Sequence, residues 1–139
     1  MGVEILVKNS NLNDEFTGNV AVIMTTYNGE HFLQEQIDSI LNQEDYPKIQ
    51  LFVRDDGSND STEKILCRNQ ESDSRIHLIR DQLGNLGVKM AFFALLHHVQ
   101  EFDWVFFSDQ DDVWPRNKVK RYFKFLFPQF TIQVQHPDD

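Results

Sequence analysis

The sequence has little cysteine and few basic residues. Its single cysteine, Cys67, excludes an internal disulfide framework and fits a reducing compartment. Lys and Arg number 13 against 22 Asp and Glu, so the formal net charge is −9. The overall basic character of nucleic-acid-binding proteins is therefore missing, and we expect no nucleic acid partner.

Long apolar runs are also missing. No run approaches the roughly 20 residues that are needed to cross a bilayer, and residues 1–19 do not resemble a secretory signal. We expect a protein without a transmembrane segment, in the cytoplasm or associated peripherally with the inner face of the cell membrane. The 139 residues fit a single domain with a sizeable core.

From Val20 onward, short apolar runs alternate with helical patterns. This alternation predicts an α/β fold with a mainly parallel sheet flanked by helices. We expect strands over residues 20–24, 49–53, 76–79 and 104–107. Residues 1–19 are expected to form an N-terminal extension, 20–125 the domain, and 126–139 a tail of uncertain structure, with either a strand or no regular structure after Phe130.

Helical spacing of apolar residues predicts the helices between these strands. The first carries Leu33, Ile37, Ile40 and Leu41, and the second begins with Asp60 and Glu63 as a capping pair. The third carries an apolar stripe of Val88, Phe92, Leu95, Leu96 and Val99, and the fourth runs over residues 116–125.

Polar residues follow three of the apolar runs. They are Thr25-Thr26-Tyr27-Asn28, then Asp55-Asp56, then Asp109-Gln110-Asp111-Asp112. Because ligands of open parallel sheets bind beyond the carboxyl ends of the strands, these residues form a candidate site. The five carboxylates would repel one another unless a cation lay between them, and a divalent ion would also bridge a diphosphate.

Each motif alone has a simpler interpretation. An Asp-x-Asp after a strand is often ordinary loop chemistry, Asp-Asp-Gly-Ser also suits a tight turn into a helix, and Tyr27 could belong to the core. The order of the motifs is more specific. From about Val20 to Lys120 the sequence resembles the family 2 glycosyltransferases, which have the GT-A fold. Residues 108–114 are most similar to bacterial rhamnosyltransferase-type members that build surface polysaccharides.

The resemblance implies a role for each nucleotide-facing residue. Thr25, Thr26 and Tyr27 would cradle the nucleotide, with the Tyr27 ring against the base. Asp56 would accept the imide N–H of uracil or thymine, and Asp55 would support the same loop. Lys89 would point toward the nucleotide or its diphosphate.

The resemblance also implies a metal, Mn²⁺ or Mg²⁺, at the Asp-x-Asp pair. Asp111 would be the direct ligand, with Asp109 reaching the ribose or a metal-bound water, and Asp112 would lie on the donor-sugar side. The implied reaction transfers a sugar from a UDP- or dTDP-linked donor to a hydroxyl of a saccharide or lipid-linked acceptor.

Members of the family place the catalytic base and the acceptor site after the Asp-x-Asp-Asp strand, whereas 27 residues follow Asp112 here. We therefore expect a GT-A fold truncated after that strand, with the base absent. The alternative hypothesis is a module that binds nucleoside diphosphate and metal without transferring sugar. An exposed apolar sheet edge would favour a homodimer.

Two other enzyme classes fit poorly. A haloacid-dehalogenase-type phosphatase also has Asp-x-Asp after an apolar strand, but its further Ser/Thr, Lys and acidic motifs are missing. A dinucleotide-binding Rossmann domain needs a glycine-rich turn after its first strand, and residues 25–29 do not form one.

Overall fold

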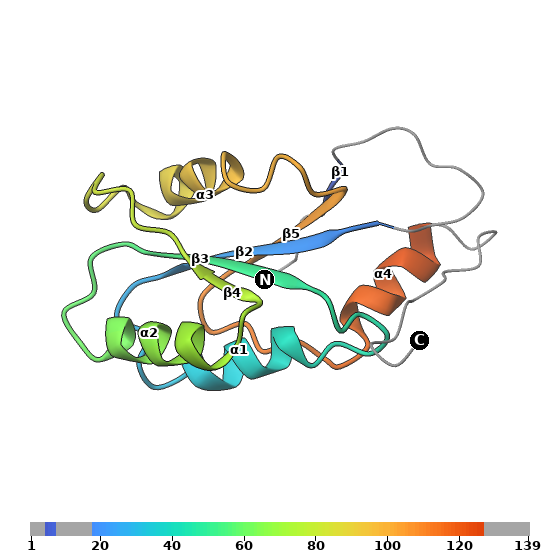
Figure 1. Cartoon of the computed structure of the whole chain (residues 1–139), viewed down its shortest axis with the longest axis horizontal. Helices are drawn as coiled ribbons and strands as arrows, with labels where there is room; N and C mark the ends of the chain where they lie inside the picture. The colour runs from blue at the N-terminus through green and yellow to red at the C-terminus, as the bar shows by residue number, and fades with distance from the viewer. Residues whose placement is uncertain (1–4, 8–17, 127–139) are drawn as a thin grey trace.

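The computed structural model describes residues 5–7 and 18–126. These residues form one mainly parallel sheet with helices on both faces (Figure 1). In chain order the elements are β1 (Ile5–Val7), β2 (Val20–Thr26), α1 (Leu33–Leu41), β3 (Gln50–Asp55), α2 (Thr62–Ser72), β4 (Ile76–Leu78), α3 (Val88–Leu96), β5 (Trp104–Ser108) and α4 (Lys118–Leu126).

The strand order in the sheet is β1-β5-β2-β3-β4. Strands β2, β3, β4 and β5 pair in parallel, and β1 pairs antiparallel with β5. The predicted mainly parallel α/β sheet is confirmed, as are all four predicted strands. The tail, for which a strand and no regular structure were both left open, lies outside the described residues.

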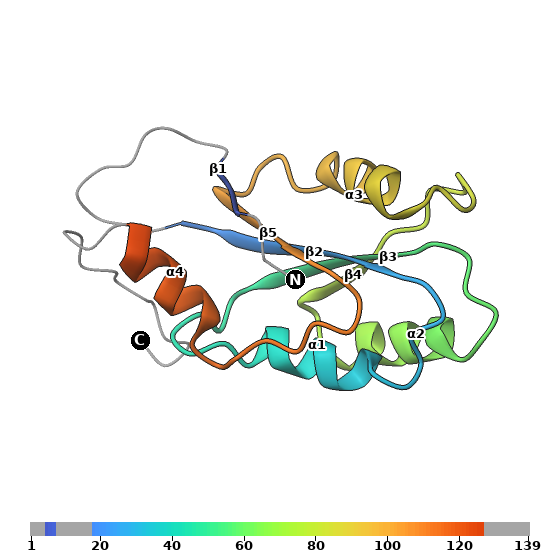
Figure 2. The same cartoon turned by 180° about the vertical axis from the view of Figure 1, so that it is seen from behind.

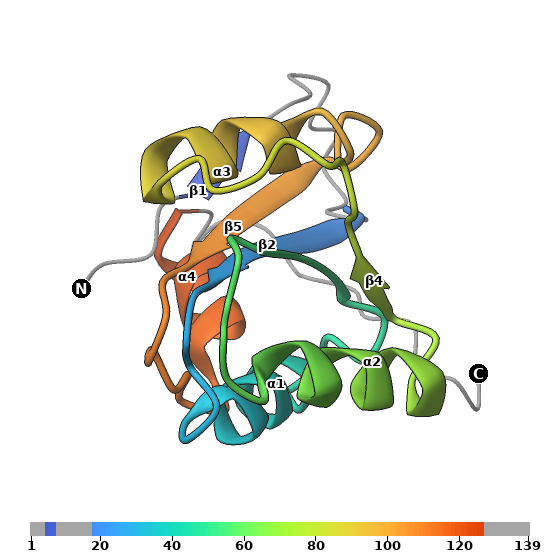
Figure 3. The same cartoon turned by 90° about the vertical axis from the view of Figure 1, so that its left-hand side faces the viewer.

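Helix α3 covers one face of the sheet, and α1, α2 and α4 cover the other (Figures 1 and 3). All seven residues of β2 are buried, because side chains on both of its faces pack against helices. Val22 points into the core beneath α1, α2 and α4, whereas its neighbour Ile23 packs with α3. The continuous apolar run is thus a consequence of coverage on both faces.

The α1 pattern is confirmed, since Leu33, Ile37, Ile40 and Leu41 are all buried. The predicted α3 stripe is only partly correct. Val88 is 62% exposed, because α3 makes contact with the sheet one turn later, at Ala91 and Phe92.

The predicted capping pair of α2 is half correct. The carboxylate of Asp60 accepts the backbone N–H of Thr62 at 2.9 Å, which serves the start of the helix. Glu63 does not reach back to the helix start, because its carboxylate instead forms an ion pair with Arg80.

Strand β1 was not expected from the sequence. Ile5, Leu6 and Val7 pair with Phe106, Val105 and Trp104 of β5. The edge of β5 is therefore paired over these residues instead of fully open. Homodimer formation through an open edge stays a prediction. None of the described helices is long and apolar enough to cross a membrane.

Helix α4 packs onto the sheet through an aromatic cluster. The Phe123 ring lies 5.5 Å from that of Tyr46, 5.1 Å from that of Trp104 and 5.8 Å from that of Phe106, measured between centroids. Trp104 and Trp114 are both buried in the same core.

We expect Phe123→Ala to lower the free energy of unfolding by about 3–5 kcal/mol, because it opens a cavity in this cluster. Phe125→Ala is the matched control, since Phe125 lies on the same helix and is 83% exposed. Urea denaturation of both variants measures the difference. Equal losses would show that α4 is not anchored through Phe123.

Candidate functional site at the carboxyl ends of β2, β3 and β5

The carboxyl ends of β2, β3 and β5 meet at one edge of the sheet. The chain passes from β2 outward to β3 and β4, then returns as β5 on the other side of β2 (Figure 2). The register aligns Thr26 with Asp55 and Met24 with Ser108. This reversal of strand order is where open α/β sheets bind ligands.

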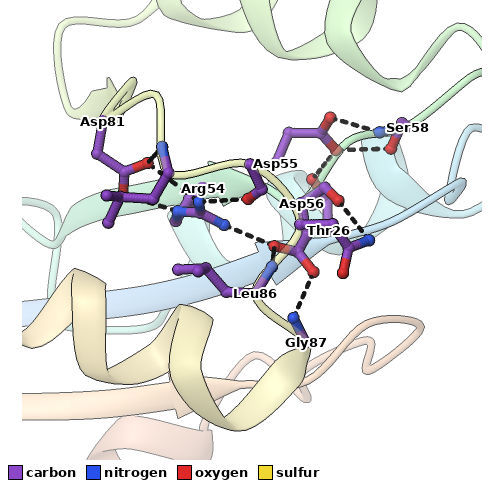
Figure 4. Close-up of polar contacts among 11 residues, drawn as sticks. Thr26, Arg54, Asp55, Asp56, Ser58, Asp81, Leu86 and Gly87 are labelled. Carbon is purple, nitrogen blue, oxygen red and sulfur yellow. Dashed lines mark hydrogen bonds and ion pairs between the residues drawn. The ribbon is translucent and has the colours of Figure 1, made fainter.

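Asp55 joins the ends of β2 and β3 to the loop that follows (Figure 4). Its carboxylate accepts the Thr26 hydroxyl at 2.7 Å, and the Ser58 hydroxyl and backbone N–H at 2.6 and 2.9 Å. The Ser58 hydroxyl oxygen also accepts the backbone N–H of Asn28 at 2.8 Å. Three segments are therefore fixed around one carboxylate.

Asp56 is buried, at 6% exposure, and is surrounded by donors (Figure 4). Its Oδ1 accepts Arg54 Nη1 at 2.6 Å and the Leu86 N–H at 2.8 Å. Its Oδ2 accepts the Gly87 N–H at 2.9 Å. Because Leu86 and Gly87 immediately precede α3, Asp56 ties the end of β3 to the start of that helix.

Arg54 is 2% exposed and binds a second carboxylate, Asp81. Its Nε and Nη2 donate to the two Asp81 oxygens at 2.8 and 3.0 Å, and Nη2 also donates to the Gly84 carbonyl at 2.8 Å. The hydrogen bonds from Arg54 lower the pKa of Asp81 to about 2. The same pairing, led by the hydrogen bond to Asp81, raises the pKa of Arg54.

The turn after β5 carries the Asp-x-Asp-Asp motif. The Asp112 N–H donates to the Asp109 carbonyl at 3.3 Å, and Asp111 has a φ of 67°, a left-handed conformation that Asp tolerates better than most residues. Asp112 lies 3.5 Å from the Lys118 ammonium. Among the described residues, no donor or cation contacts the carboxylates of Asp109 and Asp111.

The repulsion expected between five carboxylates is thus largely removed by the protein itself. Hydroxyl and backbone donors serve Asp55, Arg54 serves Asp56, and Lys118 serves Asp112. The divalent ion expected at this edge stays a prediction, with Asp109 and Asp111 as its remaining candidate ligands. Within residues 5–7 and 18–126, no group of three or more His, Cys, Asp or Glu is arranged to hold a metal.

Two glutamines hold this edge together: Gln110, which lies in the Asp-x-Asp-Asp motif but was given no role, and Gln36, which the motif analysis missed. Gln36 of α1 is 1% exposed, and its Nε2 donates to the Ser108 hydroxyl at 3.0 Å and to the Asp109 carbonyl. The Gln110 Oε1 accepts the Tyr27 N–H at 2.7 Å. Gln36 could have been found from the sequence, because it interrupts the apolar face of α1 and a buried amide needs partners.

The remaining predicted residues lie around this edge. The Tyr27 side chain is 47% exposed, so the alternative of a core residue is wrong. Thr25 is buried at the end of β2. Lys89 is exposed in the first turn of α3, two residues after Gly87.

The sequence and the fold of this chain are similar to those of sugar-transferring enzymes. The model of the family "Glycosyl transferase family 2" matches residues 21–133. The chain is 38% identical over 100 residues to the dTDP-rhamnosyl transferase RfbG of Shigella flexneri, covering 70% of the chain and 34% of the relative. It is 36% identical over 108 residues to the glucosyltransferase WfgD of Escherichia coli, covering 77% and 40%.

Solved structures agree. The mannosyltransferase PcManGT from Pyrobaculum calidifontis, in complex with GDP-Man and Mn²⁺, superposes with a TM-score of 0.69 at 27% identity, covering 80% of this chain and 33% of that one. TarS of S. aureus in complex with UDP-GlcNAc gives a TM-score of 0.63 at 28% identity, covering 79% and 31%.

The chain belongs to glycosyl transferase family 2, and the GT-A fold that the resemblance implied is confirmed. The match extends to residue 133, so the expectation that family similarity ends near Lys120 was wrong. The chain spans 34% and 40% of the lengths of RfbG and WfgD.

The lowered pKa of Asp81 predicts a specific acid sensitivity. Its pairing with Arg54 stabilises the fold fully above the ordinary pKa of 3.8, and this contribution is lost as the pH falls through about 2. Urea unfolding of the wild type and of Asp81→Asn, followed from about pH 5 to about pH 2, should show the stability difference shrinking toward acid. Parallel curves for the two proteins would contradict the pairing.

Proposed function

We propose that this chain forms the donor-binding part of a glycosyltransferase that moves a sugar from a UDP- or dTDP-linked donor to an acceptor hydroxyl in polysaccharide or glycoconjugate synthesis. The observation that carries the proposal is the division among the carboxylates at one sheet edge. Asp55, Asp56 and Asp112 have protein partners, while the described residues leave Asp109 and Asp111 available to a ligand.

Pyrimidine recognition is assigned to Tyr27 and Asp56. A half-exposed tyrosine ring beside the end of β2 suits stacking on a flat base. Asp56 is an acceptor for the imide N–H that uracil and thymine share. The names of RfbG and WfgD specify dTDP-rhamnose and UDP-glucose donors, which carry these two bases. Thr25 and Thr26 complete the cradle at the end of β2.

Asp109 and Asp111 would hold the divalent metal, Mn²⁺ or Mg²⁺. Two carboxylates, completed by diphosphate oxygens and water, are a donor set that suits Mg²⁺, which rarely occupies an all-protein cage. When bound, the metal would supply charge neutralisation for the departing diphosphate. Asp109 would otherwise reach the ribose, and Lys89 would add positive charge beside the diphosphate. The solved complex of the mannosyltransferase contains Mn²⁺.

Asp112 is assigned to the donor-sugar side. Its Oδ2 lies 3.5 Å from the ammonium of Lys118, which in turn lies 4.8 Å from the centroid of the Trp114 ring, and this oxygen accepts no hydrogen bond from the described residues. Transfer with inversion also needs a base to take the acceptor proton, and we assign none to the described residues. We propose that the whole protein, and not the described residues alone, binds the acceptor, which is a saccharide or lipid-linked. Dimer formation and peripheral attachment to the inner face of the membrane are likewise proposed for the whole protein.

We expect Asp111→Asn to weaken manganese-dependent binding of UDP and dTDP by at least about tenfold, the loss that even outer-shell changes at metal sites cause. Calorimetric titration with and without Mn²⁺ measures it. Asp45→Asn is a matched control, because Asp45 also has a left-handed backbone, with a φ of 66°, and lies beyond the other end of the sheet.

Binding that is the same with and without Mn²⁺, or unchanged in Asp111→Asn, would refute the metal site. Absence of nucleotide binding under any condition would refute the proposed function. Release of nucleoside diphosphate from the sugar donor distinguishes transfer from the alternative function, binding without transfer.

A further inference from the structure

The loop between β4 and α3 is held onto the end of β3 by one arginine. Residues 79–87 have no regular secondary structure, and left-handed φ angles occur at Gln82, Gly84 and Gly87 (62°, 74° and 78°). The loop also carries an exposed Leu83. Polar contacts with Arg54 and Asp56 therefore fix its position (Figure 4).

Arg54 is suited to this task by its shape. A guanidinium has five N–H donors in a planar fork, and four of them are used here. Two donate to Asp81, one to Asp56 and one to the Gly84 carbonyl. A lysine ammonium, with a single nitrogen, cannot reach both carboxylates in this arrangement.

The contacts leave a defined acceptor capacity on Asp56. Each carboxylate oxygen has two lone pairs. Oδ1 already accepts two donors, from Arg54 and Leu86, whereas Oδ2 accepts only the N–H of Gly87. One acceptor position remains, which fits a ligand that offers one donor.

We propose that Arg54 and Asp81 are positioning residues that determine which nucleobase the site accepts. This inference rests on the proposed function, in which Asp56 faces the base. Arg54 keeps Asp56 oriented, and Asp81 holds the guanidinium so that it occupies only one Asp56 oxygen. The site then accepts the single imide N–H of uracil or thymine and repels cytosine, whose N3 presents a lone pair to the carboxylate.

Each partner has a separate effect. Without the Asp81 charge, the guanidinium can turn onto both oxygens of Asp56 and occupy the acceptor position meant for the base. Without the guanidinium fork, Asp56 and the loop lose their common anchor. Both changes affect a ligand that donates to Asp56 far more than one that does not.

The test compares UDP and CDP, because the two differ in the base and share the sugar and diphosphate. Dissociation constants are measured at saturating Mn²⁺ by calorimetry for the wild type, Arg54→Lys and Asp81→Asn. We expect UDP to bind about tenfold more weakly in both variants, the effect of one charge-assisted hydrogen bond, while CDP changes by less than about twofold. The ratio of the CDP to the UDP dissociation constant therefore falls about tenfold in both variants.

Arg75→Lys and Asp73→Asn are matched controls. Arg75 pairs with Asp73 through Nε and Nη2 at 3.0 and 2.8 Å and also donates to two backbone carbonyls, those of Leu41 and Pro47. This pair lies before β4, at the opposite end of the strands from Asp56. Both controls should keep the wild-type ratio of CDP to UDP dissociation constants.

A purely structural role of Arg54 would weaken both nucleotides equally, and that result would overturn the inference. If Arg54→Lys fails to fold, Asp81→Asn decides alone, since the Asp81 side chain is at the rim with 18% exposure. A wild type that binds neither UDP nor dTDP refutes the proposed function. If the wild type prefers UDP over CDP and both variants show the same preference, the positioning role is refuted and the proposed function is not.

Discussion

Charge compensation at the carboxyl ends of three parallel strands is the constraint on which this site depends. Acidic side chains gathered at one sheet edge repel one another, so each needs a donor or a cation nearby. The chain meets this need by different means: hydroxyl and backbone donors for Asp55, a buried guanidinium for Asp56 and an ammonium for Asp112. Among the described residues, Asp109 and Asp111 have no such partner, so a ligand can supply the compensating charge there.

Stability alone does not explain the Arg54 network. A buried ion pair gains little over apolar residues of similar volume, because desolvation of the charges offsets their attraction. An apolar residue at position 54 would suit the neighbouring β3 pattern, in which Leu51, Phe52 and Val53 are buried. The network instead fixes a loop with three left-handed residues relative to Asp56. The network therefore fixes the orientation of Asp56, and the proposed recognition of a base requires that orientation.

The sequence predicted the strands, the two-sided coverage and the residues at the strand ends, because these follow from local apolar runs and their abrupt ends. It could not predict the partners. Arg54 and Asp81 are 27 residues apart, and only the parallel pairing of β3 with β4 brings their segments together. Strand β1 was missed because three apolar residues next to a polar stretch carry too little periodicity to distinguish.

The two halves of the proposed donor site differ in how complete they are before a ligand binds. The base side is built from contacts within the protein, so little ordering remains to be done on binding. The Asp109 and Asp111 side offers two carboxylates, fewer oxygen ligands than a divalent ion takes, and the diphosphate would supply others. Metal and nucleotide must then raise each other's affinity by the same factor, since coupling between two sites is reciprocal. In the proposed site, the turn at Asp111, with its left-handed φ of 67°, would be the point at which nucleotide and metal binding are linked.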